Sequence, residues 1–182
     1  ISLKRSMSIL SNTTDSNSVA VSLGSNLPYL NRSPREIVLA AIQSLRSISI
    51  EAEASSLYLS EPIDCPLGTG DFINAAMILR LSSKISASEL LAVLQGIEAD
   101  YGRARSAEQN QARTLDIDII SYGNQVLESA HLILPHPRAA QRRFVLMPLV
   151  EIHPEMVLPG QSENIAQLLD LLPRIENVHL LA

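Results

Sequence analysis

The sequence has too little cysteine and too few long apolar runs for several classes of protein. Its one cysteine, Cys65, excludes an internal disulfide framework and a cysteine-based zinc site. The longest uninterrupted apolar run, residues 37–42, is far shorter than the roughly 20 residues of a membrane-spanning helix. No phosphate-binding or dinucleotide-binding glycine motif and no Ser/His/Asp or Cys/His set is found. With 182 residues, 46% hydrophobic and 18% charged, the chain is expected to be one soluble, cytoplasmic domain with no membrane partner.

The charge is unevenly spread along the chain. The net charge is −5, which argues against general binding to nucleic acid. Residues 101–145 nevertheless hold six basic residues against four acidic ones, and all six are arginine, whose planar fork pairs bidentately with phosphate oxygens. These are Arg103, Arg105, Arg113, Arg138, Arg142 and Arg143. Although any one of them alone is more simply a solvated surface charge, the cluster favours a small anionic ligand.

The order of the expected elements indicates an α+β protein. Residues 1–18 are polar and aperiodic and are expected to be a disordered tail, leaving 19–182 as the folded domain. Strands are expected at residues 19–23, 50–54, 72–81 and 115–121, and helices after two capping boxes, Ser33-Pro34-Arg35-Glu36 and Ser86-Ala87-Ser88-Glu89.

This order, β-α-β-β-α-β, predicts a ferredoxin-like antiparallel sheet with helices on one face, followed by a C-terminal extension. In the extension we expect an apolar segment at residues 144–150, broken by Pro148, and a late helix from Ser162. Gly102 is expected to end the second helix. Helices on one face would leave the other open to a ligand.

The most informative local pattern is a pair of aspartates on one strand. Side chains alternate along a strand, so Asp116 and Asp118 point the same way, with their Cα atoms about 6.6 Å apart. Leu115, Ile117 and Ile119 then fill the opposite, core side. Two neighbouring carboxylates repel each other unless a cation lies between them, and hard oxygen ligands favour Mg²⁺ held together with substrate phosphates. A pair of solvated aspartates is the simpler alternative.

Three other groups of residues are weaker candidates. Asn74 shares a strand face with Phe72, which suits a flat heterocycle by hydrogen bonding and stacking, although taken alone the pair is better explained as a core Phe and a hydrogen-bonded Asn. Gln95 and Glu98 lie one helical turn apart and by themselves look like surface residues. His136 is held between two prolines and has no second histidine at metal-ligand spacing.

Six ordered blocks of the chain resemble the 6-hydroxymethyl-7,8-dihydropterin pyrophosphokinase family, over residues of about 19 to 160. The blocks are SLGSN at 22–26, YLSEP at 58–62, FINA at 72–75, Ile97-Glu98 with GRAR at 102–105, RTLDID at 113–118, and LPHPR at 134–138 with RRFVL at 142–146.

The resemblance implies transfer of the terminal pyrophosphoryl group of ATP to the pterin hydroxymethyl group, with release of AMP. It implies two Mg²⁺ ions held by Asp116 and Asp118, with ATP as co-substrate. It places Arg103 and Arg113 among the catalytic residues, Arg103 on a mobile loop. The ATP site would comprise Gln95, Glu98, Arg105, Arg113, Ile119, His136 and Arg142, and the pterin site Ser60, Asn74, Phe72 and Phe144.

The chain departs from the family at residues 109–112, which read Gln-Asn-Gln-Ala where Arg-Trp-Gly-Pro is typical. The resemblance therefore implies a weaker seal over ATP. Three alternatives stay open: a non-catalytic or weakly active member that binds pterin or nucleotide, a different metal-dependent transferase with a D-x-D pair, and one domain of a longer folate enzyme fused to a second folate-pathway domain.

Overall fold

The computed structural model describes residues 17–63, 65–81, 85–103 and 112–181, so nearly all of the expected tail lies outside it. The strands are β1 (Ser18–Ser25), β2 (Ser49–Ala54), β3 (Tyr58–Ser60), β4 (Phe72–Leu81), β5 (Asp116–Tyr122), β6 (Leu127–Glu128), β7 (Ile133–Leu134) and β8 (Val178–Leu180). The helices are α1 (Pro34–Ser47), α2 (Ala87–Asp100), the 3-10 helix η1 (Ala139–Gln141), α3 (Arg143–Ile152) and α4 (Ile165–Leu171). Within the described ranges, no helix has the length and apolar character to cross a membrane.

Six strands form one antiparallel sheet with β1 and β4 at its centre. The order is β5-β1-β4-β3-β8, and β2 also pairs with β4. Strand β1 is buried on both faces, which explains its nearly continuous apolar sequence. Strands β6 and β7 form a separate two-stranded sheet beside β5.

Both capping boxes expected from the sequence are formed. The Ser33 hydroxyl accepts from the Glu36 amide at 3.3 Å, and the Glu36 carboxylate accepts from the Ser33 amide at 2.8 Å. Ser86 and Glu89 repeat the arrangement at the start of α2, at 3.2 and 2.7 Å. Each such cap is worth about 1 kcal/mol of helix stability. These local contacts start α1 and α2 where the sequence predicts.

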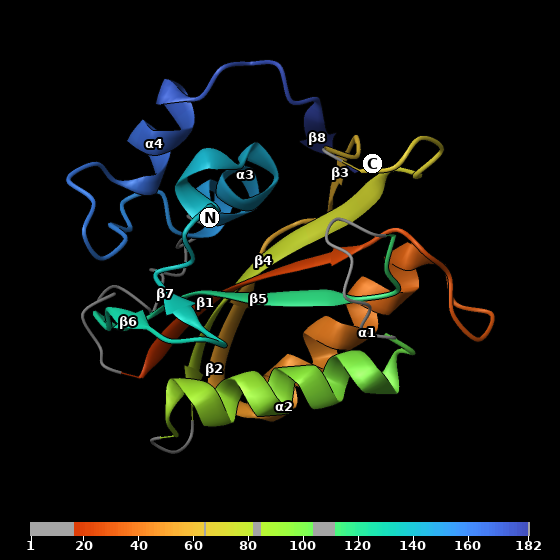
Figure 1. Ribbon diagram of the computed structural model, residues 1–182, viewed down its shortest axis with the longest axis horizontal. Coiled ribbons are helices and arrows are strands. Elements are labelled where there is room, and N and C mark those ends of the chain that lie inside the picture. Colours follow the sequence, from red (N-terminus) through yellow and green to blue (C-terminus); the bar gives the residue numbers. More distant parts are fainter. Residues whose placement is uncertain (1–16, 64, 82–84, 104–111, 182) are drawn as a thin grey trace, which may run out of the picture.

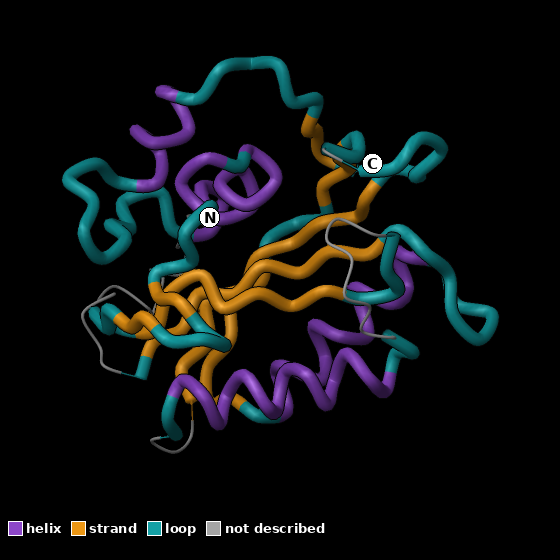
Figure 2. The backbone as a smooth tube through the Cα atoms, viewed as in Figure 1, coloured by secondary structure: helices purple, strands orange, loops and turns teal. Residues whose placement is uncertain are grey.

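The sheet is covered on both faces, which corrects the expectation that one stays open. Helices α1 and α2 pack on one face, and α3 and α4 on the other (Figures 1 and 2). Strand alternation directs Ala75 and Met77 of β4 toward α1 and α2, and Ala76 and Ile78 toward α3. The C-terminal extension is thus a second layer, because its apolar residues need the sheet to bury them. Only part of that face is left for polar side chains.

Three local expectations are wrong in detail. Helix α3 continues through Pro148, which is buried; the missing amide costs one helical hydrogen bond, and the apolar packing of the helix offsets it. The alternation of apolar and polar residues at 50–54 places Ile50 on the apolar face of the strand, but Ile50 is 56% exposed, because the register of β2 shifts between Ser49 and Glu51. The last helix starts at Ile165, where Asn164 caps it, a few residues after the expected start.

Candidate active site

Three strands bring polar residues of one sheet face into neighbouring rows. Asp116 of β5 and Asn74 of β4 both pair with Gly24 of β1, which lies between them. Asp118 pairs with Ser22 in the next row. Adjacent strands lie about 4.8 Å apart, so the backbones of Asp116 and Asn74 are about 10 Å apart. Gly24 places no side chain between them, and a Cβ atom there would lie 3.5 Å from Asn74 Oδ1.

The two aspartates point away from the apolar core, as their spacing predicts. Leu115, Ile117 and Ile119 are buried, whereas both aspartates are only partly buried. Burial nevertheless raises the pKa of the Asp118 carboxyl to about 7; the negative charge of Asp116 adds to the rise, and Arg103 opposes it. This carboxyl pair is therefore a place where added positive charge would be stabilising.

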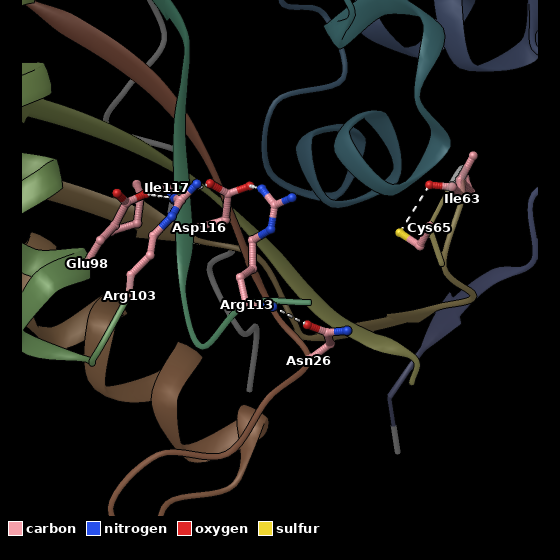
Figure 3. Close-up of polar contacts among 8 residues, drawn as sticks. All are labelled: Asn26, Ile63, Cys65, Glu98, Arg103, Arg113, Asp116 and Ile117. Carbon is pink, nitrogen blue, oxygen red and sulfur yellow. Dashed lines mark hydrogen bonds and ion pairs between the residues drawn. The ribbon is translucent and has the colours of Figure 1, made fainter. Parts of the chain in front are cut away.

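Two arginines already neutralise Asp116. Arg103 Nη1 donates to one carboxylate oxygen, and Arg113 Nη1 donates to the other (Figure 3). Burial alone lowers the pKa of Arg103, but the charges of Asp116 and Glu98 outweigh it and the net shift is upward. The Arg103 guanidinium therefore stays charged beside the position where an anionic ligand is expected.

Glu98 is not the surface residue that its helical position suggested. It is 2% exposed, and its Oε1 accepts from the Ile117 amide at 2.8 Å and from Arg103 Nη1. The carboxylate of α2 therefore links the helix to the outer edge of β5 and holds one side of Arg103. The helical pattern alone could not reveal this, because the partner amide lies on a strand 19 residues later.

The loop between β1 and α1 holds the segment that contains Arg113. The Arg113 amide donates to Asn26 Oδ1 at 2.7 Å, and the Arg113 carbonyl accepts from the amides of Asn26 and Leu27. Asn26 Nδ2 also donates to the Gly70 carbonyl at 3.2 Å, so one side chain joins three loops. The sequence pattern did not single out Asn26 as a candidate. It closes the SLGSN block directly after a strand, however, where functional polar residues are common.

His136 is hydrogen-bonded to β5 and interacts electrostatically with Arg142. The His136 amide donates to the Ile120 carbonyl at 2.8 Å, and its Nδ1 accepts from the Arg138 amide at 3.2 Å. Burial, followed by the charges of Arg142 and Arg138, lowers the pKa of His136 to about 4. Since Nδ1 is an acceptor, the neutral ring carries its proton on Nε2, which is left as a donor.

The charge of Arg142 interacts with His136 and also with Asp116 and Asp118. Burial lowers its pKa, as does the charge of Arg138, while Asp118 and Asp116 oppose the shift. The Arg142 guanidinium carbon lies 5.3 Å from the centre of the Phe144 ring, so the cation covers the aromatic face.

Three of the four residues expected to hold a heterocycle lie together on β3 and β4, and the fourth, Phe144, is on α3. Asn74 and Ser60 are each 3% exposed, and Asn74 Nδ2 donates to Ser60 Oγ at 2.8 Å and to the Phe72 carbonyl at 3.2 Å. Among the described residues, none donates to Asn74 Oδ1. The two hydrogen bonds that Nδ2 donates fix the orientation of the Asn74 side-chain amide. Its carbonyl oxygen, Oδ1, remains able to accept a hydrogen bond.

The remaining predicted residues lie outside the described part of the chain, on α2 or in the core. Arg105 and residues 109–111 lie outside the described part of the chain, so the effect of the Gln-Asn-Gln-Ala sequence stays a prediction. Gln95 is partly buried on α2, one turn before Glu98. Ile119 is buried in the core, on the face of β5 opposite Asp118. In the described ranges, no group of three or more His, Cys, Asp or Glu side chains is arranged to hold a metal ion.

Comparison with known proteins identifies the family. The sequence pattern described as "7,8-dihydro-6-hydroxymethylpterin-pyrophosphokinase (HPPK)" matches residues 20–154. A 2-amino-4-hydroxy-6-hydroxymethyldihydropteridine pyrophosphokinase of Synechocystis is 40% identical over 151 residues, covering 82% of this chain and 73% of the relative. The protein of the same name from Haemophilus influenzae is 36% identical over 144 residues, covering 78% and 85%.

Longer proteins contain the same kind of domain. The folic acid synthesis protein fol1 of Pneumocystis carinii is 36% identical over 85% of this chain, which spans 20% of that protein. A crystal structure of HPPK-DHPS from Plasmodium falciparum, with pterin and p-hydroxybenzoate, matches with a TM-score of 0.64. Its identity is 14%, and it covers 85% of this chain, which spans 43% of that structure's chain, so it supports the fold alone. From the family match and the relatives of similar length, the chain belongs to the 7,8-dihydro-6-hydroxymethylpterin-pyrophosphokinase family.

Proposed function

We propose that this chain transfers the terminal pyrophosphoryl group of ATP to the hydroxymethyl group of 6-hydroxymethyl-7,8-dihydropterin, a step of folate biosynthesis. The observation that carries the proposal is the row formed by Asp116, Gly24 and Asn74. In this row the backbones of Asp116, whose carboxylate binds two arginines, and of Asn74, whose side-chain amide is oriented, are about 10 Å apart, with a bare glycine between them. That separation suits an ATP tail and a flat acceptor lying side by side.

Arginine supplies the positive charge for the phosphate side of this site. The guanidinium groups of Arg103 and Arg113 form ion pairs with Asp116, and the charge of Arg142 interacts with that of Asp118. Their forked donors suit phosphate oxygens. The neutral His136 would add an uncharged Nε2–H donor. These groups would bind and orient the triphosphate and stabilise the charge that develops on it.

Asp116 and Asp118 fit Mg²⁺ by their donor chemistry. Each offers carboxylate oxygens on one face of β5, and Mg²⁺ is usually held by one or two carboxylates together with substrate phosphates. Phosphate oxygens of ATP would supply further oxygen ligands to the metal. When bound, Mg²⁺ would neutralise the triphosphate and align it for attack.

The acceptor side would be formed by Asn74, Ser60, Phe72 and Phe144. Asn74 Oδ1 can accept from a ring N–H or exocyclic amine, and Ser60 holds the amide in the orientation that this requires. An aromatic ring would contribute stacking, and Phe144 is already covered on one face by Arg142.

The reaction needs no covalent intermediate on the protein. The substrate hydroxyl oxygen attacks the β-phosphorus of ATP, a new O–P bond forms, the bond between the β-phosphorus and the α–β bridging oxygen breaks, and AMP leaves. The hydroxyl proton is released. The protein would contribute positioning and charge neutralisation, which dominate catalysis of phosphoryl transfer.

Three finer expectations remain part of this proposal. The strand order β5-β1-β4 with β2 beside β4 supports a ferredoxin-like core. The fusion of related domains in longer folate proteins supports the alternative that this is one domain of a multifunctional enzyme. A cytoplasmic location stays a prediction.

The decisive experiment measures AMP formed from ATP and 6-hydroxymethyl-7,8-dihydropterin with and without Mg²⁺. Asp118→Ala should abolish detectable turnover, since it removes one of two carboxylates, while the far-ultraviolet spectrum stays native because the side chain lies outside the apolar core. Asp170→Ala, which removes an exposed carboxylate of α4, is the matched control and should keep full activity. Turnover by Asp118→Ala at the level of the control would refute the metal assignment, and lack of AMP from the unmodified protein would favour a binding module.

A further inference from the structure

A strained turn precedes α1 and projects two side chains toward the end of α2. The Tyr29 amide donates to the Arg32 carbonyl at 3.0 Å, and the Arg32 amide donates to the Tyr29 carbonyl at 2.9 Å. The two residues between them, Leu30 and Asn31, have φ angles of 45° and 61°. This is the geometry of a two-residue hairpin turn that usually uses glycine or asparagine, so Leu30 is an unfavourable residue there. The side chain of Leu30 is 76% exposed, so packing of this side chain does not explain why the strained turn is kept.

Helix α2 ends in a cap that fixes the path of the chain into Arg103. Gly102 has a φ angle of 75°, its amide donates to the Ala99 carbonyl at 2.9 Å, and the Arg103 amide donates to the Glu98 carbonyl at 3.1 Å. These two bonds and the left-handed glycine make a Schellman cap. Gly102 was expected from the sequence to end this helix, and that prediction is confirmed.

The turn contacts both residues that precede Arg103. A Cβ atom on Gly102 would lie 2.2 Å from Tyr29 Cε2, so the tyrosine ring rests on the glycine at a distance that no other residue allows. The Arg32 guanidinium carbon lies 5.8 Å from the centre of the Tyr101 ring. The Tyr101 hydroxyl is in turn within 3.4 Å of Ser44 Oγ on α1. Side chains from the turn and from α1 therefore enclose residues 101 and 102.

We infer that Tyr29 is a positioning residue: its ring holds Gly102 in place and thereby sets the direction in which Arg103 enters the active site. Arg103 follows Gly102 directly, and its guanidinium bridges Glu98 and Asp116. A small rotation at Gly102 would move that guanidinium away from both carboxylates. The inference rests on the proposed function in that Arg103 serves phosphoryl transfer, whereas the packing of Tyr29 on Gly102 does not depend on it.

Tyr29→Ala tests this directly, with two matched variants. Tyr29→Phe keeps the ring and should behave as the unmodified protein, because the Tyr29 hydroxyl makes no hydrogen bond within the described residues. Leu30→Ala changes the exposed tip of the same turn and should also have no effect. Tyr29→Ala should lower kcat for AMP release by about tenfold or more, since displacements of about 1 Å can cost a hundredfold, and should leave KM for the pterin unchanged.

A double-mutant cycle separates positioning from a general structural role. If Tyr29 acts through Arg103, adding Tyr29→Ala to Arg103→Ala should cause no further loss of kcat. Independent, multiplying losses would overturn the inference, as would a normal kcat for Tyr29→Ala.

Amide hydrogen exchange provides a readout that does not require turnover. The Arg103 amide should exchange faster in Tyr29→Ala than in Tyr29→Phe, with an unchanged midpoint of urea unfolding. Equal exchange in the two variants would refute the packing role even if activity fell. Lack of AMP from the unmodified protein would refute the proposed function alone, since the exchange comparison would still decide the role of Tyr29.

Discussion

Arg113 donates to the oxygen of Asp116 that Arg103 leaves free, so both carboxylate oxygens accept from guanidinium groups. The proposed function would place a metal ion on this same carboxylate and phosphate oxygens on the two arginines. Binding of the metal–nucleotide complex would therefore require an exchange of partners, in which Asp116 takes the ion and the arginines take phosphate oxygens. This exchange implies competition between an arginine and a metal ion for one carboxylate.

The competition can be measured without nucleotide. Arg113→Gln should tighten binding of Mn²⁺ alone, by about fivefold if the lost ion pair is worth about 1 kcal/mol. The same variant should weaken binding of Mn²⁺–ATP, because a phosphate ligand is lost. Titration calorimetry measures both affinities, with the exposed Arg174→Gln as control. Weaker binding of Mn²⁺ alone to Arg113→Gln would contradict the exchange.

Glu98 should be important for stability as well as for the site. Glu98→Ala removes the acceptor of the Ile117 amide and one partner of Arg103, and should lower the free energy of unfolding by about 2–4 kcal/mol. Glu98→Gln keeps an acceptor of the same size and should cost less. Urea denaturation of both variants measures the difference, and equal losses would mean that the hydrogen bond to Ile117 contributes little.

His136 should stay neutral throughout the physiological range. Its folded-state pKa of about 4 lies below the ordinary value of 6.5, because of burial and the charges of Arg142 and Arg138. Between these values the unfolded chain binds a proton that the folded chain does not, so this histidine's contribution lowers stability as the pH falls from 6.5 toward 4. Imidazole NMR shifts should show the titration near pH 4, and Arg142→Gln should move it upward. A midpoint near 6.5 in the unmodified protein would contradict the burial of the ring.

The Tyr58 hydroxyl should have a strongly raised pKa. Burial raises its pKa to about 12, and the hydrogen bond to Glu151 at 2.9 Å adds to the rise. From pH 10 to 12 the unfolded chain has lost a proton that the folded chain keeps, so this group's contribution lowers stability as the pH rises. The ultraviolet difference titration between the unmodified protein and Tyr58→Phe isolates this group. Glu151→Gln should lower the pKa only partway, because burial is the larger cause.

Local signals in the sequence predict much of the fold and the direction in which the two candidate aspartates point. The capping boxes at Ser33 and Ser86 need only residues three positions apart, and both helices start where they predict. The orientation of Asp116 and Asp118 follows from strand alternation alone. The Gly102 cap is equally local, because a left-handed residue at a helix end favours glycine.

Long-range contacts explain what the sequence could not predict. Glu98 is buried because β5 presents an unpaired amide to it, and no helical pattern contains that information. Asn26 and Arg113 are 87 residues apart and meet only in the folded chain. Pro148 stays in a helix because α3 has a sheet to pack on. The packing of Tyr29 on Gly102 likewise depends on where α2 ends in space.

The carboxylate of Glu98 has one more consequence, for self-association. Strand β5 is an end strand of the six-stranded sheet, and an exposed end strand can recruit a strand from another molecule. Glu98 takes up the Ile117 amide, and the His136 amide takes up the Ile120 carbonyl, so two of the backbone groups of β5 are already satisfied from outside the sheet. The Glu98 carboxylate and the backbone of His136 thus also shield this edge of β5 against pairing with a strand of another molecule.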